Sequence, residues 1–99
     1  GWMQVDNLKI DKPKKWDKKW HMVMFDIAQI KRIYREALRG KLKQLGFYLF
    51  QKSIWVIPYN CEKEVKILKE FFGLRSHEIR LITINNIGDD AELKEFFKL

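Results

Sequence analysis

One carboxylate lies where it could do chemistry. Asp26 directly follows the nearly continuous apolar run Trp20–Phe25, and side chains at strand ends often face a ligand. One aspartate cannot hold a magnesium ion alone. Two Asp26 side chains facing each other across a twofold axis could bind Mg²⁺ and activate water for phosphodiester cleavage. The alternative, which we favour, is a helix N-cap, because Asp26 followed by Gln29 has the form of a capping box.

A second group of residues could bind phosphate. Five cations lie on one face of a predicted helix, with only Glu36 to offset them: Lys31, Arg32, Arg35, Arg39 and Lys43. Each contact of such a cation with a phosphate adds salt-dependent affinity through counterion release. The alternative is an ordinary solvated helix surface. Because one acid faces five cations, we predict nucleic-acid contact here.

Aromatic residues also alternate with lysines in Lys14–Trp20. This pattern suits the backbone and bases of a single strand. Such a stretch is more often a linker whose tryptophans pack on the domain edge, which we expect for Trp20 and leave open for Trp16. We predict that residues 1–18 are an extended lead-in or linker and that residues 19–99 form the folded domain.

The other reactive residue types predict no catalytic or metal centre. His21 and His77 lie far apart and lack neighbours at ligand spacing, so we expect both to be structural or exposed. Cys61 shares a predicted helix face with Val65 and is expected to be a buried thiol. No Gly-rich phosphate loop, nucleophile elbow or histidine with a matched partner occurs.

The hydrophobic pattern predicts the elements that must position these residues. Four strands are expected: Trp20–Phe25, Phe47–Lys52, Ile54–Pro58 and Glu78–Ile84. The first helix buries apolar residues at helical spacing and ends before Gly46: Ile30, Ile33, Tyr34, Ala37, Leu38, Leu42 and Leu45. The second helix starts at Asn60, ends at Gly73 and buries Cys61, Val65, Leu68 and Phe72. A tail helix, Ala91–Lys98, is capped by Asp89 or Asp90 and packs Leu93, Phe96 and Phe97.

The order strand, helix, strand, strand, helix, strand predicts an α+β fold, a ferredoxin-like βαββαβ sandwich with a short C-terminal helix. Helices cover one sheet face in that fold, whereas the first and third strands are apolar on both sides. Something must cover the second face. Because isologous dimers are the commonest assemblies, we predict a homodimer. An RNA-recognition motif has the same element order, but Ser53–Pro58 lacks its Gly-interleaved aromatic pattern.

Length and charge limit the function further. The 99 residues suffice for one two-layer core and exclude a separate catalytic domain. The net charge of +7 lies entirely in residues 1–52, which indicates an anionic polymer as partner. The single cysteine and the absence of a long apolar run predict a soluble, cytoplasmic protein without a membrane partner.

Several segments together carry a resemblance to a known family: Trp16–Ile27, Leu45–Phe47, Gln51–Val56, Pro58-Tyr59 and Phe71–Leu74. They are similar to the central domain of PaaX-type transcriptional repressors. That domain is itself similar to the small CRISPR-associated endonuclease subunit of the spacer-acquisition complex. The resemblance covers residues 7 to about 97 and implies a ferredoxin-like homodimer.

The two branches of this resemblance imply different functions. In the CRISPR family the strand-one aspartate, matched by Asp26, is implicated in metal binding and nuclease activity. That family's dimer also bridges integrase subunits and holds duplex DNA. In PaaX-type repressors an upstream winged helix reads the operator and this domain mediates dimerisation. Asn7–Pro13 looks like the linker between those two domains, which the free CRISPR subunit normally lacks.

We therefore predict a non-catalytic, dimerising domain of a PaaX-like regulator that associates with double-stranded DNA and requires no cofactor. The alternative is a CRISPR-associated, Mg²⁺-dependent endonuclease or spacer-acquisition subunit of antiviral defence. Asp26 would then be its catalytic and metal-binding residue. Because the chain begins with Gly1, an upstream winged-helix domain has to be allowed for.

Overall fold

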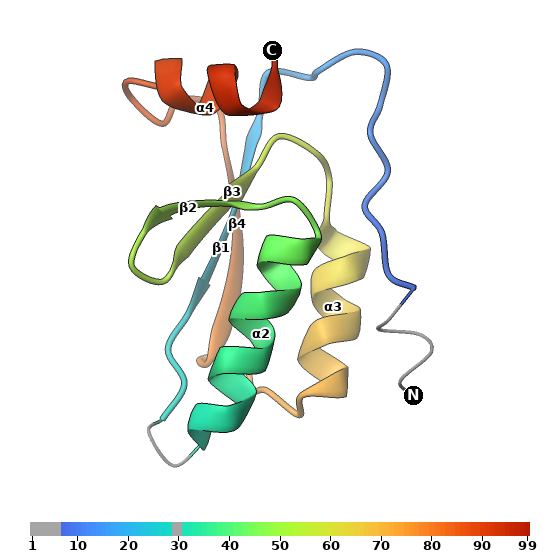
Figure 1. Ribbon diagram of the computed structural model, residues 1–99, viewed down its shortest axis with the longest axis vertical. Helices are drawn as coiled ribbons and strands as arrows, with labels where there is room; N and C mark the ends of the chain where they lie inside the picture. The colour runs from blue at the N-terminus through green and yellow to red at the C-terminus, as the bar shows by residue number, and fades with distance from the viewer. Residues whose placement is uncertain (1–6, 29–30) are drawn as a thin grey trace.

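A four-stranded antiparallel sheet forms the centre of the computed structural model, which describes residues 7–28 and 31–99. These residues contain four strands and three helices, in the order β1 (Trp20–Phe25), α2 (Arg32–Gln44), β2 (Tyr48–Gln51), β3 (Ile54–Ile57), α3 (Glu62–Phe71), β4 (Ile79–Ile84) and α4 (Ala91–Phe97). The strands are arranged β2-β3-β1-β4 in the sheet. Helices α2 and α3 cover one face of the sheet, and α4 lies across one end (Figure 1).

Strand β1 has the bounds that the apolar run predicts, and it pairs with β3 on one side and β4 on the other. Val23 lies opposite Trp55 in β3 and Leu81 in β4. Val23 and Trp55 are buried in the larger core, on the side of α2 and α3. Arg80 within the fourth strand predicts an edge strand, and β4 does form one edge of the sheet, with Arg80 exposed.

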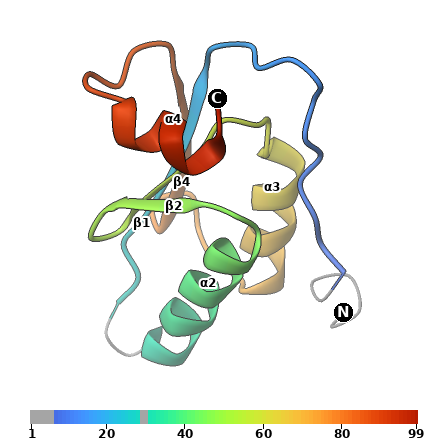
Figure 2. The same cartoon turned by 45° about the horizontal axis from the view of Figure 1, so that its top comes forward.

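The opposite face of the sheet has a small core of its own. Trp20, Val56 and Leu93 are buried there, where α4 packs on β1 and β3. Trp20 is 1% exposed, so it lies in the interior, and its predicted packing is confirmed. On the other side of the sheet, Leu8 and Ile10 of the lead-in pack against the larger core. The lead-in runs past α3 in both views (Figures 1 and 2).

The start of α2 differs from the prediction. The helix begins at Arg32, with Lys31 in the N-cap position and no side-chain cap bond, so the prediction that Asp26 caps it is wrong. Gln29, the other half of the predicted capping box, lies outside the described residues. The chain at Asp26 still pairs with the β4 side, because the N–H of Asp26 donates to the carbonyl of Glu78 at 2.9 Å, and the next residue, Ile27, is buried in the core.

The predicted buried face of α2 is correct only in its second half. Leu38 and Leu42 are buried, whereas Ile33 is 82% exposed and Tyr34 is 50% exposed. Ala37 is exposed as well, and Ile30 lies outside the described residues. The first turns of α2 lie beyond the β2–β3 hairpin (Figure 1). Tyr34 lies beside the end of α3, with its ring centroid 6.3 Å from that of Phe72, the C-cap of that helix.

The remaining helix ends follow local signals that the sequence contains. Gly46 has a φ of +100° directly after the C-cap of α2, a conformation that strains residues with a Cβ. The side chain of Asn60 accepts a hydrogen bond from the backbone N–H of Glu62 at 3.1 Å, although α3 starts one residue later than predicted. Gly73 closes α3 as predicted. Asp89 accepts the N–H of Ala91 at 3.2 Å and so supports the start of α4.

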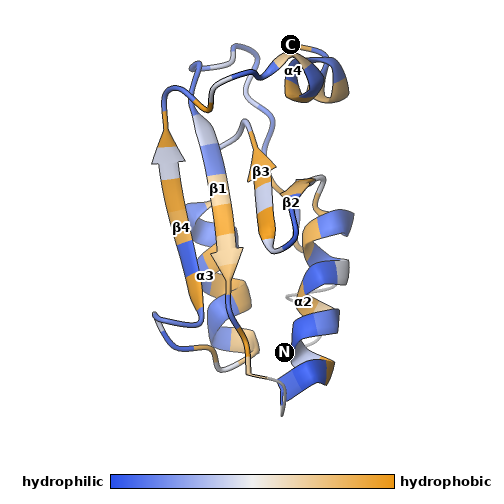
Figure 3. Cartoon of the chain, turned by 90° about the vertical axis from the view of Figure 1, so that its left-hand side faces the viewer, coloured by the Kyte–Doolittle hydropathy of each residue, from blue (hydrophilic) through white to orange (hydrophobic). Residues whose placement is uncertain are grey.

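The sheet face opposite α2 and α3 is apolar, as predicted, and α4 covers it only at one end (Figure 3). Met22, Met24 and Ile54 are half-buried there, and Ile82 is 39% exposed. Phe96 of α4 contacts Tyr48 with ring centroids 5.0 Å apart but is 54% exposed, so its predicted packing is incomplete. A large part of this face is thus left without a covering element in the described chain.

Gly40 occupies the interior of α2, where glycine costs about 1 kcal/mol relative to alanine. A Cβ at this position would meet no atom within 4 Å, so the packing of the chain does not require glycine. We predict that Gly40→Ala raises the free energy of unfolding by about 0.5–1 kcal/mol. Urea unfolding followed by circular dichroism measures this change.

Gly46→Ala is the matched control, because it adds the same methyl group at a φ of +100°. It should destabilise the protein. An unchanged or lowered stability of Gly40→Ala would contradict the prediction.

Candidate functional site

Asp26 lies at the exposed end of β1. Its backbone N–H donates to the carbonyl of Glu78 at 2.9 Å, which fixes the chain beside the start of β4. Asp26 lines an open depression of about 650 Å³ together with residues of the β2–β3 hairpin, among them Gln51, Lys52 and Ser53. The predicted strand-end position of this carboxylate is therefore correct.

The residues of one chain do not fit a magnesium site at Asp26. Within residues 7–28 and 31–99, no group of three or more His, Cys, Asp or Glu side chains could hold a metal ion. Glu78 is the carboxylate whose backbone meets Asp26, but its own oxygens are already bound. Its Oε2 lies 3.1 Å from Lys31 Nζ, and its Oε1 accepts the N–H of Arg75 at 3.0 Å.

Glu78 is a structural residue that the sequence analysis missed. It is buried, and its bond to Lys31 joins the start of β4 to the start of α2. The backbone N–H of Arg75 and the ammonium of Lys31 stabilise the charged form, which lowers the pKa of Glu78. The sequence signal that could have identified Glu78 is its place directly before the apolar strand β4. An acid at such a place can be buried with the end of the strand.

The five predicted phosphate-binding residues divide into two groups. Lys31 is committed to Glu78. The other four recur every three or four residues and form one line along α2, the α2 stripe: Arg32, Arg35, Arg39 and Lys43. The stripe spans about 16 Å at the rise of an α-helix.

Arg39 ties the α2 stripe to the sheet. Its guanidinium carbon lies 5.6 Å from the ring centroid of Trp55, and its Nη1 donates to the carbonyl of Lys52 at 3.3 Å. Arg35 Nε lies 3.8 Å from Glu36 Oε1. Arg32 and Lys43 are exposed. The stripe thus lies beside the β2–β3 hairpin, with one of its cations held against the hairpin.

Trp16 packs within the protein. Its ring centroid lies 4.9 Å from that of Trp20, and its Nε1 donates to the carbonyl of Lys19 at 3.0 Å. Lys94 Nζ lies 5.9 Å from the Trp16 ring centroid. These contacts hold Trp16 half-buried on the domain.

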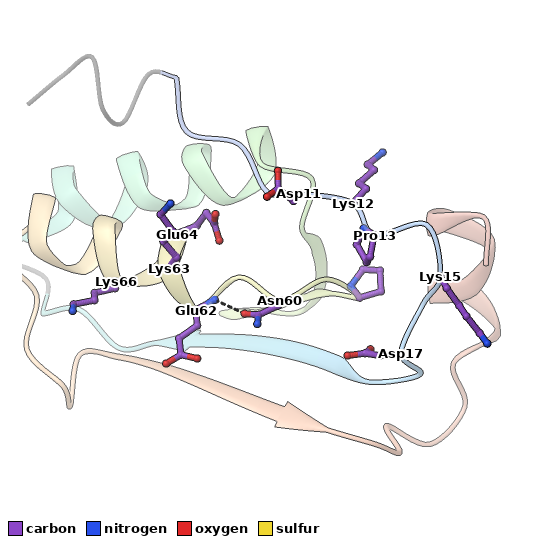
Figure 4. Close-up of a pocket in the computed structure, with 11 residues that line it drawn as sticks. Asp11, Lys12, Pro13, Lys15, Asp17, Asn60, Glu62, Lys63, Glu64 and Lys66 are labelled. Atoms are coloured by element: carbon purple, nitrogen blue, oxygen red, sulfur yellow. Dashed lines mark hydrogen bonds between the residues drawn. The ribbon is translucent and has the colours of Figure 1, made fainter.

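The hollow between the lead-in and α3 has no preference for either sign of charge (Figure 4). Its volume is about 800 Å³. Four lysines and four acids line it: Lys12, Lys15, Lys63, Lys66, Asp11, Asp17, Glu62 and Glu64. Because these charges balance, the hollow offers no net attraction to a phosphate backbone.

The histidines and the cysteine behave as the sequence predicts. Cys61 is buried, and desolvation, followed by the charge of Glu64, raises the pKa of its thiol to about 12. His21 is buried between strands, with Nδ1 3.3 Å from the hydroxyl of Thr83, and burial lowers its pKa against a weaker opposing effect of Asp17. His77 is exposed. None of the three is placed for catalysis.

Fold and site together define a small α+β domain with a basic line along one helix and, among its described residues, no metal-binding cluster. A family model described as the PaaX protein central Cas2-like domain matches residues 13–94. The chain therefore belongs to the PaaX central-domain family, which confirms the predicted resemblance. Comparison with curated proteins found no match, and comparison with solved structures found none either. No helix in the described part of the chain is long and apolar enough to cross a membrane.

We predict that Glu78→Gln destabilises the protein at neutral pH and much less in acid. The pKa of Glu78 is lowered in the fold, so its carboxylate stabilises the protein above the unfolded value of 4.5. This contribution is lost as the pH falls through the folded value. Urea unfolding of the parent and the variant at about pH 7 and about pH 3 should show a difference that shrinks in acid.

Glu95→Gln, at an exposed position of α4, is the control. It should change stability little at neutral pH. A Glu78→Gln effect of equal size at both pH values would show that the carboxylate charge is not responsible.

Proposed function

We propose that the chain is a dimerising, DNA-associated domain of a PaaX-like transcriptional regulator and that it does not catalyse a reaction. Membership of the PaaX central-domain family supports the regulatory role. The apolar sheet face that α4 leaves partly uncovered is the observation that carries the proposal of a dimer. Such a regulator works in the cytoplasm, and a separate winged-helix domain would read the operator.

The proposed fold is the ferredoxin-like sandwich. Four strands in the order β2-β3-β1-β4, all pairs antiparallel, support it. So does the position of α2 and α3 on one sheet face (Figure 1). In this arrangement β1 and β3 are the inner strands, and their second face needs a cover wider than the short helix α4.

A second copy of the chain is the proposed cover. Met22, Met24 and Ile54 line the open part of the face and are only half-buried. A face of this kind is self-complementary under a twofold axis, because each copy offers the other the same apolar surface. Exposed apolar patches of this sort mark interaction surfaces on soluble proteins.

The α2 stripe is the proposed DNA contact. Its four cations lie along one line, so they can follow a phosphate backbone rather than a single phosphate. Lys31 drops out of the predicted set because Glu78 already neutralises it. The proposal for DNA therefore rests on Arg32, Arg35, Arg39 and Lys43.

The nuclease alternative, with its integrase partner, has less support. Among the residues that the structure describes, Asp26 has no second carboxylate available, because Glu78 is bound to Lys31 and Arg75. A magnesium site would require the partner copy to bring its own Asp26 close. No contact in the single chain favours that arrangement over any other.

The dimer is tested by placing a charge on the open sheet face. We predict that the parent sediments as a dimer in analytical ultracentrifugation. Met24→Glu should sediment as a monomer, because its carboxylate would be desolvated in the interface, and its circular dichroism spectrum should be unchanged. Ile33→Glu, on the 82% exposed position of α2, is the control and should remain a dimer. A monomeric parent at high micromolar concentration would refute the proposal.

The DNA contact is tested by the salt dependence of affinity. Reversing Arg32 and Arg35 to Glu should weaken binding to a fluorescent duplex and lower the slope of log K against log[salt] by about 2, since each phosphate contact contributes about 0.9. Lys63→Glu with Lys66→Glu changes the net charge equally on α3 and should leave the slope nearly unchanged (Figure 4). An equal effect of both pairs would indicate only a general charge effect.

The same samples test the nuclease alternative. With Mg²⁺ added, the duplex should stay intact over the binding assay. Cleavage by the parent that is lost in Asp26→Asn would overturn the non-catalytic proposal and support the alternative.

A further inference from the structure

A groove lies between the second half of α2 and the β2 edge of the sheet, and the proposed function does not use it. Its volume is about 740 Å³. This value lies within the range of about 300–1,000 Å³ that is typical of small-molecule sites. Apolar side chains from β2, β3 and α4 supply much of its lining, among them Tyr48, Leu49, Trp55 and Phe96. We call it the α2 groove.

Trp55 lines this groove and has an unsatisfied donor. The side chain is 4% exposed, and its Nε1 is buried with no hydrogen-bond acceptor among the described residues. Buried donors without an acceptor are rare in folded proteins, and each calls for an explanation. Because this nitrogen is itself inaccessible, a molecule in the groove would meet the indole ring and not the N–H.

Gly40 also lines the groove. Neither its backbone conformation nor the packing of the chain explains a glycine in the middle of α2, because a Cβ there would meet no atom within 4 Å. A side chain at this position would extend into space that the groove leaves open. The missing side chain is therefore explained if a ligand occupies that space.

Charge indicates the kind of ligand. Arg39 and Lys43 line the groove against one acid, Glu36, so the lining carries one net positive charge. Glu36 is itself 3.8 Å from Arg35 Nε. The other nearby acid, Glu92, accepts a hydrogen bond from the hydroxyl of Tyr48, which raises the pKa of Tyr48.

Arg39 and the indole ring of Trp55 lie in the same part of the groove, because the guanidinium carbon is 5.6 Å from the Trp55 ring centroid. We propose that the α2 groove binds a small organic anion, with its apolar body on Tyr48, Leu49 and Phe96 and its acidic group at Arg39 and Lys43. The inference does not rest on the proposed DNA contact or on the dimer. Its test contains no DNA.

A pair of fluorescent probes of nearly equal shape tests the proposal on the full chain. One is 8-anilinonaphthalene-1-sulfonate, a flat apolar anion, and the other is its uncharged counterpart N-phenyl-1-naphthylamine. We expect the parent to bind the anion about tenfold more tightly than the neutral probe, as a charge-assisted hydrogen bond contributes. Arg39→Gln should remove most of this preference while the neutral probe still binds.

Gly40→Gln tests the position of the site. Glutamine is a good helix former, so the variant should fold, and its side chain should weaken binding of both probes at least about tenfold. Lys43→Glu, on the exposed rim, is a second variant that leaves the packing untouched and should weaken binding of the anion alone. Lys66→Glu, at an exposed position of α3 outside the groove, is the matched control for Lys43→Glu and should leave both affinities unchanged.

Three results would overturn the proposal. They are equal affinity of the parent for the two probes, unchanged binding in Gly40→Gln with a native circular dichroism spectrum, and a loss of anion binding in Lys66→Glu as large as in Lys43→Glu, which would indicate only a general charge effect. Each of them is independent of whether the chain binds DNA.

Discussion

Strands β1 and β3 are apolar on both of their faces, and most of the remaining structure follows from the need to cover both. Val23 and Trp55 face the layer formed by α2 and α3, whereas Trp20 and Val56 face the other way and meet Leu93 of α4. Two separate cores therefore share one sheet. The first is large because two helices and the lead-in contribute to it. The second ends where the short helix α4 ends, and this shortage of cover is the basis for proposing an assembly of two chains.

Some basic residues form bonds that hold the fold together, and others remain on the surface. Glu78 is buried at the start of β4 and holds Lys31, and its backbone carbonyl also holds Asp26. These bonds fasten the end of β1, the start of α2 and the start of β4 to one another. The carboxylate that could have joined Asp26 in a metal site is thereby used for folding. Farther along α2, Arg32 and Lys43 are exposed, and with Arg35 and Arg39 they form a line of positive charge beside the β2–β3 hairpin.

Much of the fold could be predicted because the local signals were strong. The apolar run gave β1 its bounds, and Gly46 and Gly73 marked two helix ends through their positive φ values. The predictions failed where contacts between residues far apart in the sequence determine the structure. The backbone bond of Asp26 to Glu78 keeps Asp26 beside β4, so α2 starts later, at Arg32, and Ile33 is 82% exposed despite its helical spacing. Likewise, no local pattern indicated the ion pair of Lys31 with Glu78, because the two residues lie 47 positions apart in the sequence.

Arg39 belongs both to the α2 stripe and to the α2 groove, and it is bracketed by Trp55 and Lys52. A side chain that serves two binding surfaces couples them thermodynamically. If an anion in the groove neutralised this guanidinium, the field over the stripe would weaken, and a phosphate on the stripe would disfavour the anion by the same factor. Such reciprocal antagonism requires no movement of the backbone. A single fixed cation would be sufficient to convert the concentration of a small molecule into a change of affinity for a polyanion.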